Sequence, residues 1–467
     1  MDFSAANQAL WNIIIQLGII AGAIMVSNGL IRSFKWFRNT LLPTSVLAGF
    51  LLLILKSLHI LRMDDNFLEM LVYHCIALGF IAMSLRVVNK SANRNGSLTG
   101  PKSGAVIVGT YLIQGVTGLV ITILLAYTVM PSMFKAAGLL LPMGFGQGPG
   151  QANNVGTTYQ GMGFTGGRSF GLAIAATGYI CACTVGVIMV NILAKRNHSR
   201  SSKKQSSEEL SVGFFQDHNE IPVSDSIDRL SVQLAMVLLT YLATFLLLRG
   251  VTGLFSSISE GLANTLNPLF WGFNFIFGSA LAMLVRVCLD RARKMNVLER
   301  QYQNNYLLNR LSGFFFDIMI VAGIASINIQ DLRGLWLPFV LMVIAGGFVT
   351  WFYLKYVCRK AFPDYYDEGL ISMYGMLTGT IGSGILLLRE IDPDYSTPAA
   401  NNLVIGSSYG IVIGAPVLIL VGLAPKSTAM CFVTVGLAAA YWAILTLFIV
   451  KAKRKESKRE IVRTLKV

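Results

Sequence analysis

Charged residues are scarce in this sequence. Only 13% of its 467 residues are Asp, Glu, Lys or Arg, whereas a soluble domain has about 25%. Hydrophobic residues make up 54%. This composition excludes an ordinary water-soluble protein and predicts an all-α protein that crosses a membrane several times, because helices satisfy their own backbone hydrogen bonds in lipid.

Histidine and cysteine are also few. The four histidines lie far apart in the chain, and no HExxH pair or nucleophile elbow is present. Two of the six cysteines form the sequence Cys181-Ala182-Cys183, which is not a CxxC motif. The sequence therefore predicts no metal centre, organic cofactor or disulfide, and it argues against an enzyme.

Long apolar runs are abundant, and each is long enough to cross a hydrocarbon layer about 30 Å thick. Eleven such spans are expected near residues 9–31, 40–58, 67–86, 104–130, 167–194, 229–249, 266–289, 311–329, 334–356, 402–424 and 428–450. Two further stretches, 137–163 and 365–398, are expected to enter the membrane and turn back.

The basic residues gather between spans. Of the 38 Lys and Arg, 30 fall in the segments 32–39, 86–103, 195–229, 286–310, 355–363 and 451–467. All six segments lie on one side if the spans alternate, and the positive-inside rule makes that side cytoplasmic. The N-terminus is then outside and the C-terminus inside. The net charge of +15 thus indicates topology and contact with anionic lipid rather than nucleic-acid binding.

A polar linker at 195–228 divides the chain into two sets of five spans. The first repeat is expected at 1–194, the second at 229–426, and an extra helix with a basic tail at 427–467. Because the linker is cytoplasmic, the two sets run through the membrane in opposite directions. Inverted repeats of this kind are a physical basis for alternating access.

Glycine-rich interruptions occur at matching places in the two sets. The first reads GFGQGPGQ from Gly144, and the second reads GMLTGTIGSG from Gly375. Pro149 removes a helical hydrogen bond, and alternate glycines are hard to reconcile with a continuous helix. A matched pair of breaks is typical of a transporter binding site, although small residues also allow close helix packing. We expect the two tips to meet.

Four stretches resemble the bacterial sodium/glutamate symporter family: LLPTSVLAGFLLLILK in the second span, IALGFIAMSLR in the third, the first glycine-rich hairpin continuing to Gly171, and Tyr366-Asp367-Glu368 before the second hairpin. The resemblance covers most of the chain outside the linker and tail. It implies sodium-coupled uptake of glutamate or a related small carboxylate across the bacterial inner membrane. It also implies a homodimer with a static scaffold and a mobile, elevator-like core, and sodium as the coupling ion.

Three features differ from the usual family pattern. The first hairpin has Gln147, Pro149 and Gln151 where a histidine motif is frequent, the second hairpin continues as Ile385-Leu386-Leu387, and a final span is added. Another organic anion or a neutral amino acid therefore remains an alternative substrate. A channel or a membrane enzyme is a less favoured class of function.

A broken helix offers N–H groups to an anion and carbonyl groups to a cation. The predicted substrate-binding residues are those at the two breaks: Gly146, Gln147, Gly148, Gly150, Gln151, Thr380, Gly382, Ser383 and Gly384. Arg389, five residues beyond Gly384, is added because guanidinium binds carboxylate through two hydrogen bonds. Its alternative role is an ion pair with Glu390 or Asp392.

Oxygen-bearing side chains near the breaks and inside the spans are candidates for binding sodium: Asn153, Asn154, Thr378, Asp317, Asn401 and Asn402. Asp317 stands out because it lies within an apolar span, where a carboxylate must pair, bind a cation or stay protonated. For Asp317 a contact between helices is the alternative. For the hydroxyl groups the alternative is a hydrogen bond within their own helix.

Overall fold

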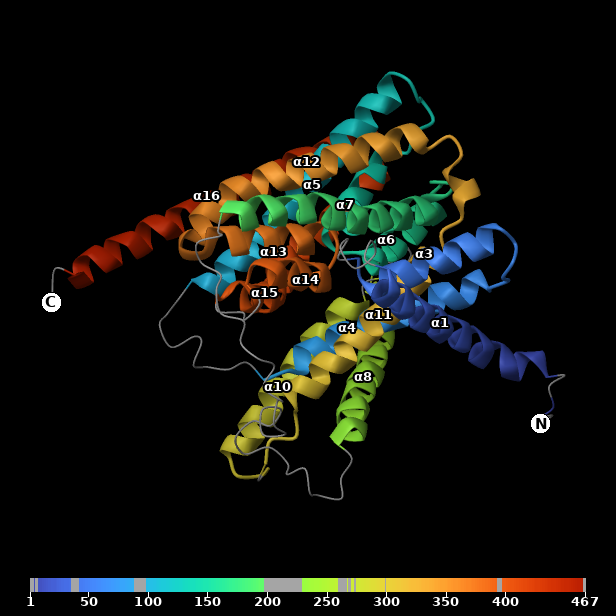
Figure 1. Ribbon diagram of the computed structural model, residues 1–467, viewed down its shortest axis with the longest axis horizontal. Coiled ribbons are helices and arrows are strands. Elements are labelled where there is room, and N and C mark those ends of the chain that lie inside the picture. The colour runs from blue at the N-terminus through green and yellow to red at the C-terminus, as the bar shows by residue number, and fades with distance from the viewer. Residues whose placement is uncertain are drawn as a thin grey trace. The chain divides into compact units, whose positions relative to one another are not determined.

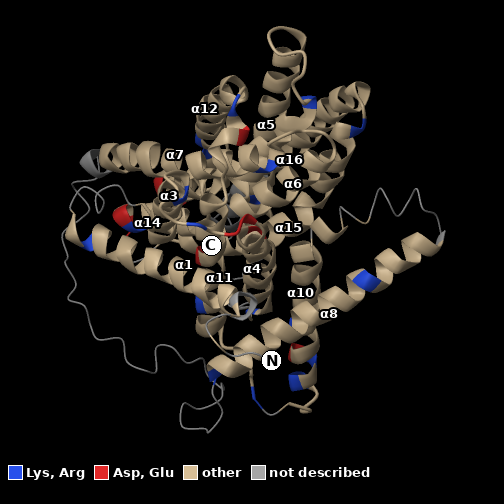
Figure 2. Ribbon diagram, turned by 90° about the vertical axis from the view of Figure 1, so that its right-hand side faces the viewer, with Lys and Arg blue, Asp and Glu red and all other residues tan. Residues whose placement is uncertain are grey.

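The computed structural model describes residues 4, 7–34, 42–87, 98–196, 229–258, 267, 270–272, 274–298, 300–392 and 397–464. The regular elements in this part of the chain are helices (Figure 1). Most of the ribbon is neither acidic nor basic (Figure 2), as the low charge content of the sequence requires.

Nine helices among the described residues are long and apolar enough to cross a membrane. They are α1 (Gln8–Ser33), α4 (Asp65–Leu85), α5 (Thr99–Tyr127), α7 (Gly167–Arg196), α8 (Arg229–Ile258), α11 (Asn305–Ala325), α12 (Trp336–Ala361), α15 (Ala399–Leu423) and α16 (Thr428–Thr464). The predicted all-α, multi-pass architecture is therefore confirmed at this level.

Two of the expected spans differ. The span predicted at 40–58 is α3 (Thr44–Ser57), a helix of 14 residues, which at 1.5 Å per residue is about 21 Å long and too short to cross the hydrocarbon layer alone. The span predicted at 266–289 appears as α10 (Asn274–Lys294). Its last turn carries Arg291, Arg293 and Lys294, so apolar character ends before the helix does.

Both predicted hairpins are broken helices. In the first, the short helices η2 (Lys135–Leu139) and η3 (Pro142–Gly146) precede α6 (Pro149–Gly161). In the second, α13 (Tyr366–Thr378) and α14 (Ile381–Ile391) are separated by Gly379 and Thr380. Proline at the start of both η3 and α6 fixes φ for a new helix and cannot donate to the preceding one. The breaks therefore fall inside the glycine-rich stretches.

The chain forms two compact units. Unit 1 comprises Met1–Glu69, Gly96–Ser199 and Ile320–Val467, and unit 2 comprises Met70–Asn95 and Arg200–Met319. Each unit thus takes segments from both halves of the sequence. The linker at 195–228 lies almost wholly outside the described residues.

In unit 1, α5 packs against several other helices. It contacts α12, α15 and α16 along with both short helices of the first hairpin (Figure 1). Gly118 of α5 touches the backbone of Gly138, so a side chain at either position would clash. The extra helix α16 belongs to this unit too, since Thr446 is 3.1 Å from the Tyr353 hydroxyl of α12.

In unit 2, the remainder of α4 packs with α8, α10 and α11. Phe80 lies against Phe275 and Phe316, with ring centroids 5.2 and 5.4 Å away. The Nδ1 atom of His74 is 2.7 Å from the Tyr241 hydroxyl, which also accepts a hydrogen bond from Asn274. His74 is therefore satisfied by a neighbouring side chain.

Candidate functional site

The two helix breaks meet inside unit 1. A Cβ atom built on Gly148 would lie 3.5 Å from Cγ2 of Thr380, 3.7 Å from the carbonyl oxygen of Gly379 and 3.9 Å from the Tyr179 hydroxyl. These segments are far apart in the sequence. We call the region formed by Gly148, Tyr179, Gly379 and Thr380 the tip junction. The expectation that the two tips meet is thus confirmed.

Two helices begin at the tip junction. α6 starts at Pro149, directly after Gly148, and α14 starts at Ile381, directly after Thr380. No side chain caps either start. The first N–H groups of a helix lack partners within the helix and carry a partial positive charge. Two such ends facing one another create an environment that favours an anion.

The third residue of each of these helices is polar and buried. Gln151 is 1% exposed, and Ser383 is 3% exposed. Neither amide atom of Gln151 has a hydrogen-bond partner in the described structure, and neither does the Ser383 hydroxyl. A buried polar group without a partner costs about 1–3 kcal/mol, and such groups are rare in folded proteins. Because they occur at matching positions beside the breaks, we take this region as the candidate binding site.

The Ser383 hydroxyl is directed at the break itself. It would lie 2.8 Å from a Cβ atom built on Gly379, so only glycine at this position leaves the hydroxyl accessible from the junction. In the first hairpin, Gly148 is required by its backbone conformation rather than by lack of space. Its φ of 87° and ψ of −174° belong to a backbone region that is essentially restricted to glycine.

Two further helices of unit 1, α7 and α5, contact the hairpins near the tip junction. On α7, a side chain at Gly178 would strike the carbonyl of Thr378 and lie 3.0 Å from the Phe145 ring, which places α7 between the two hairpins. On α5, Gln114 donates a hydrogen bond to the carbonyl of Leu377 at 3.0 Å. Our sequence reasoning missed Gln114. The available signal was a glutamine in the middle of the span at 104–130.

The predicted substrate-binding residues differ in how far their side chains are exposed. Gly146, Gly150 and Gln151 are buried, Gln147 and Thr380 are half-buried, and Gly382 is exposed. A side chain at Gly384 would lie 2.5 Å from the carbonyl of Ser372. Gly384 therefore serves close packing between α13 and α14.

Arg389 lies at the opposite end of α14 from the tip junction. It is an exposed residue of the last turn, eight residues and about 12 Å along the helix from Ile381. The sequence places Arg389 among the predicted substrate-binding residues. The helical geometry instead carries the side chain away from the break.

If the protein is the transporter that the sequence predicts, Arg389→Ala should therefore retain most of the wild-type uptake. Initial rates in vesicles, normalised to the amount of folded protein, provide the measurement. A loss greater than about tenfold, equivalent to 1.4 kcal/mol, would return Arg389 to the substrate site.

The proposed sodium ligands are dispersed. Thr378 hydrogen-bonds within its own helix to the carbonyl of Tyr374 at 2.8 Å, which is the alternative role for a hydroxyl. Asn402 donates to the Tyr365 hydroxyl at 2.6 Å, near the start of the second hairpin. Asn401 is exposed. Asp317 is an exposed residue of α11 in unit 2. The three of these residues that lie in unit 1, Thr378, Asn401 and Asn402, do not form a ligand set at the tip junction.

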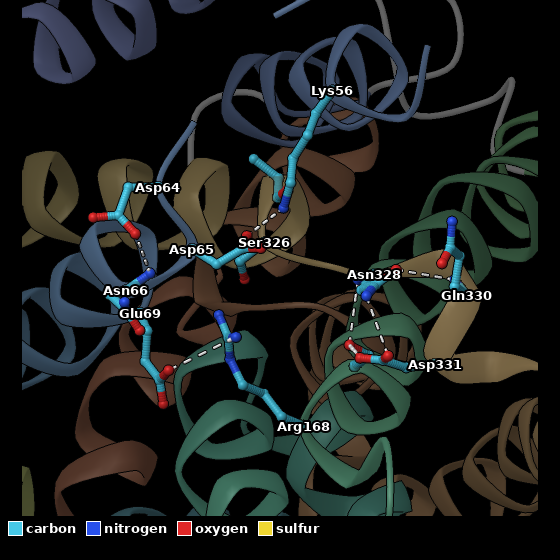
Figure 3. Close-up of polar contacts among 12 residues, drawn as sticks. Lys56, Asp64, Asp65, Asn66, Glu69, Arg168, Ser326, Asn328, Gln330 and Asp331 are labelled. Atoms are coloured by element: carbon cyan, nitrogen blue, oxygen red, sulfur yellow. Dashed lines mark hydrogen bonds and ion pairs between the residues drawn. The ribbon is translucent and has the colours of Figure 1, made fainter. Parts of the chain in front are cut away.

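Asn153 and Asn154 follow Gln151 on α6, and both are buried. The Oδ1 atom of Asn153 accepts a hydrogen bond from Nε of Arg168 at 3.0 Å. Arg168 also lies 3.7 Å from Glu69, as Figure 3 shows. Asn153 is therefore part of a polar network beside the junction.

This network ties together the starts of α4 and α7 and the loop before α12. Thr157 donates to Glu69 at 3.1 Å, and Ser169 donates to Asp331 at 2.8 Å. Asn328 hydrogen-bonds to Asp331 at 3.1 Å, and Lys56 forms an ion pair with Asp65 (Figure 3). The acidic groups here are used in contacts between elements. Arg168 is accordingly a structural residue at the edge of the site.

No described group of three or more His, Cys, Asp or Glu side chains could hold a metal ion. The polar atoms at the tip junction are amides, hydroxyl groups and helix ends. Such a set can bind a small anion and a hard monovalent cation, and it contains no activated nucleophile or acid–base pair among the described residues.

Comparison with known proteins adds no relative: no family model matches the chain, and no curated protein matches its sequence.

Proposed function

We propose that the protein is a secondary active transporter that takes up glutamate or a related small carboxylate together with sodium. The observation that carries the proposal is the meeting of two helix N-termini, each with a buried polar side chain lacking a partner at its third position. Paired helix ends at a break are how broken-helix transporters bind carboxylate. An anion there would satisfy backbone and side-chain donors together.

The spacing of the elements supports an inverted repeat. α6 and α14 begin 232 residues apart (381 − 149), and α7 and α15 begin at the same separation (399 − 167). Gln151 and Ser383 are separated by the same number of residues. The basic segments of the sequence support opposite orientations for the two halves, with the N-terminus outside and the linker and tail cytoplasmic.

The division of the chain supports an elevator mechanism of alternating access. Both tips belong to unit 1, so the site would travel as part of a single body. We further propose a homodimer in the bacterial inner membrane, as the family resemblance implies. A neutral amino acid or another organic anion is the alternative substrate.

Purified protein in vesicles is expected to accumulate labelled glutamate only under an inward sodium gradient. One net positive charge moving down 100 mV supplies about 2.3 kcal/mol, roughly fifty-fold accumulation. The control replaces sodium with potassium at equal ionic strength and membrane potential.

Equal uptake in potassium would refute sodium coupling. Unlabelled dicarboxylates and neutral amino acids, added in excess, identify the substrate by competition. Flux that rises linearly with substrate concentration, without saturation, would favour a channel.

A further inference from the structure

Gln114 occupies the place where α5 crosses both hairpins. Its side chain is fully buried at 0% exposure. Its Nε2 atom donates one hydrogen bond to Oγ1 of Thr350 on α12, at 2.7 Å, and another to the carbonyl of Leu377 in the second hairpin, at 3.0 Å. Its Oε1 atom lies 3.0 Å from where a Cβ atom of Gly146 would be, in the first hairpin. One amide therefore touches both broken helices.

The hydrogen-bond network fixes which way the amide points. The carbonyl of Leu377 can only accept, so it requires the nitrogen side of the amide. The Thr350 hydroxyl donates its proton to the carbonyl of Gly346 at 2.7 Å, so it too can only accept from Gln114. Oε1 must then face the first hairpin, and it has no hydrogen-bond partner in the described structure.

The surroundings of Oε1 limit the size of what it can bind. A methyl group at Gly146 would already contact the ring of Tyr111 and lie 3.0 Å from Oε1. This leaves no room for an organic substrate, whereas a monatomic cation approaches oxygen more closely than carbon does.

We propose that Oε1 of Gln114 is a ligand of the monovalent cation that travels with the substrate. The inference rests on the proposed sodium coupling and assigns the ion a place between α5 and the first hairpin. A hard cation prefers oxygen ligands, and a fully buried carbonyl oxygen of an amide is one. The amide that would bind the ion through Oε1 also donates a hydrogen bond to the carbonyl of Leu377 in the second hairpin. Ion binding would therefore affect the positions of both hairpins at the tip junction.

The test is the sodium dependence of thermal unfolding of the purified full-length protein, measured in NaCl titrations balanced with KCl. The unfolding temperature of the wild type is expected to rise with sodium concentration until it reaches a plateau, because an ion that binds only the folded state stabilises that state. Gln114→Met keeps the volume and removes the oxygen. It should raise the half-saturating sodium concentration by about tenfold or more.

Thr110→Val is the matched control. Thr110 is fully buried on the same helix, one turn before Gln114, and its hydroxyl bonds to the carbonyl of Val106 within that helix. The unfolding temperature of Thr110→Val should depend on sodium concentration as that of the wild type does. Thr350→Val is the second test variant, because it removes one of the two hydrogen bonds that orient the amide. Thr350→Val should raise the half-saturating sodium concentration as well, by a smaller factor than Gln114→Met does.

The outcomes separate the two proposals. A wild-type protein without any sodium response would overturn both sodium coupling and this ion site. A normal wild-type response with an unchanged half-saturating sodium concentration in Gln114→Met would overturn the Gln114 assignment alone. If Gln114→Met does not fold, an unchanged half-saturating sodium concentration in Thr350→Val overturns the Gln114 assignment instead.

Discussion

Gln151→Leu is expected to reduce transport by about 10- to 100-fold in kcat/KM, the effect of losing a hydrogen bond of 1.5–3 kcal/mol to a charged group. The same variant should unfold at an equal or higher temperature than the wild type when substrate is absent. The reason is that the wild-type amide is buried at 1% exposure without a partner, and leucine removes that cost.

This opposite effect on activity and stability is the signature of a binding residue. A residue that only held the fold together would lose both. The control is Gln160→Leu, which changes the same residue type on the same helix, but at an exposed position near its far end. Gln160→Leu should transport normally. A Gln151→Leu protein with lowered stability and unimpaired transport would contradict the assignment.

Gly148→Ala is expected to lower transport by a comparable factor for a different reason. Space is not limiting, since the nearest atom to a new Cβ would be Cγ2 of Thr380 at 3.5 Å. The backbone is limiting, because a φ of 87° with a ψ of −174° costs a residue with a side chain about 1–3 kcal/mol. Alanine would relax this strain by moving the start of α6 away from the tip junction.

Gly161→Ala is the matched control for this prediction. Gly161 ends the same helix, and a Cβ atom there would meet nothing within 4 Å. That variant should be as active as the wild type and no less stable. The measurement is substrate affinity from saturation of uptake, together with the unfolding temperature. Unchanged affinity in Gly148→Ala would show that the break tolerates a conventional backbone and does not shape the site.

Much of this architecture was readable from composition and periodicity. Low charge and long apolar runs predicted a multi-pass helical membrane protein, and nine of the described helices have the length and apolar character to cross a membrane. Glycine and proline predicted where two helices break, because their backbone constraints are local. Both breaks fall within the predicted stretches, at Gln147–Gly148 and Gly379–Thr380.

Helix geometry decided matters that the sequence left open. Five residues separate Gly384 from Arg389 in the sequence, but α14 runs uninterrupted from Ile381 and carries Arg389 to its far end. Likewise, α3 is too short to cross the hydrocarbon layer alone, although the apolar run around it is longer. Sequence separation is a poor guide to direction once a helix has formed.

The sequence by itself determined the environment of this protein and the positions of its two breaks, because hydropathy and backbone restrictions act residue by residue. Only the tertiary structure decided which groups face each other. Thr350 and Leu377 hold Gln114 in one orientation, and Gly148 meets Thr380 across more than two hundred residues of chain. Such contacts arise from helix packing in three dimensions, and no local pattern encodes them.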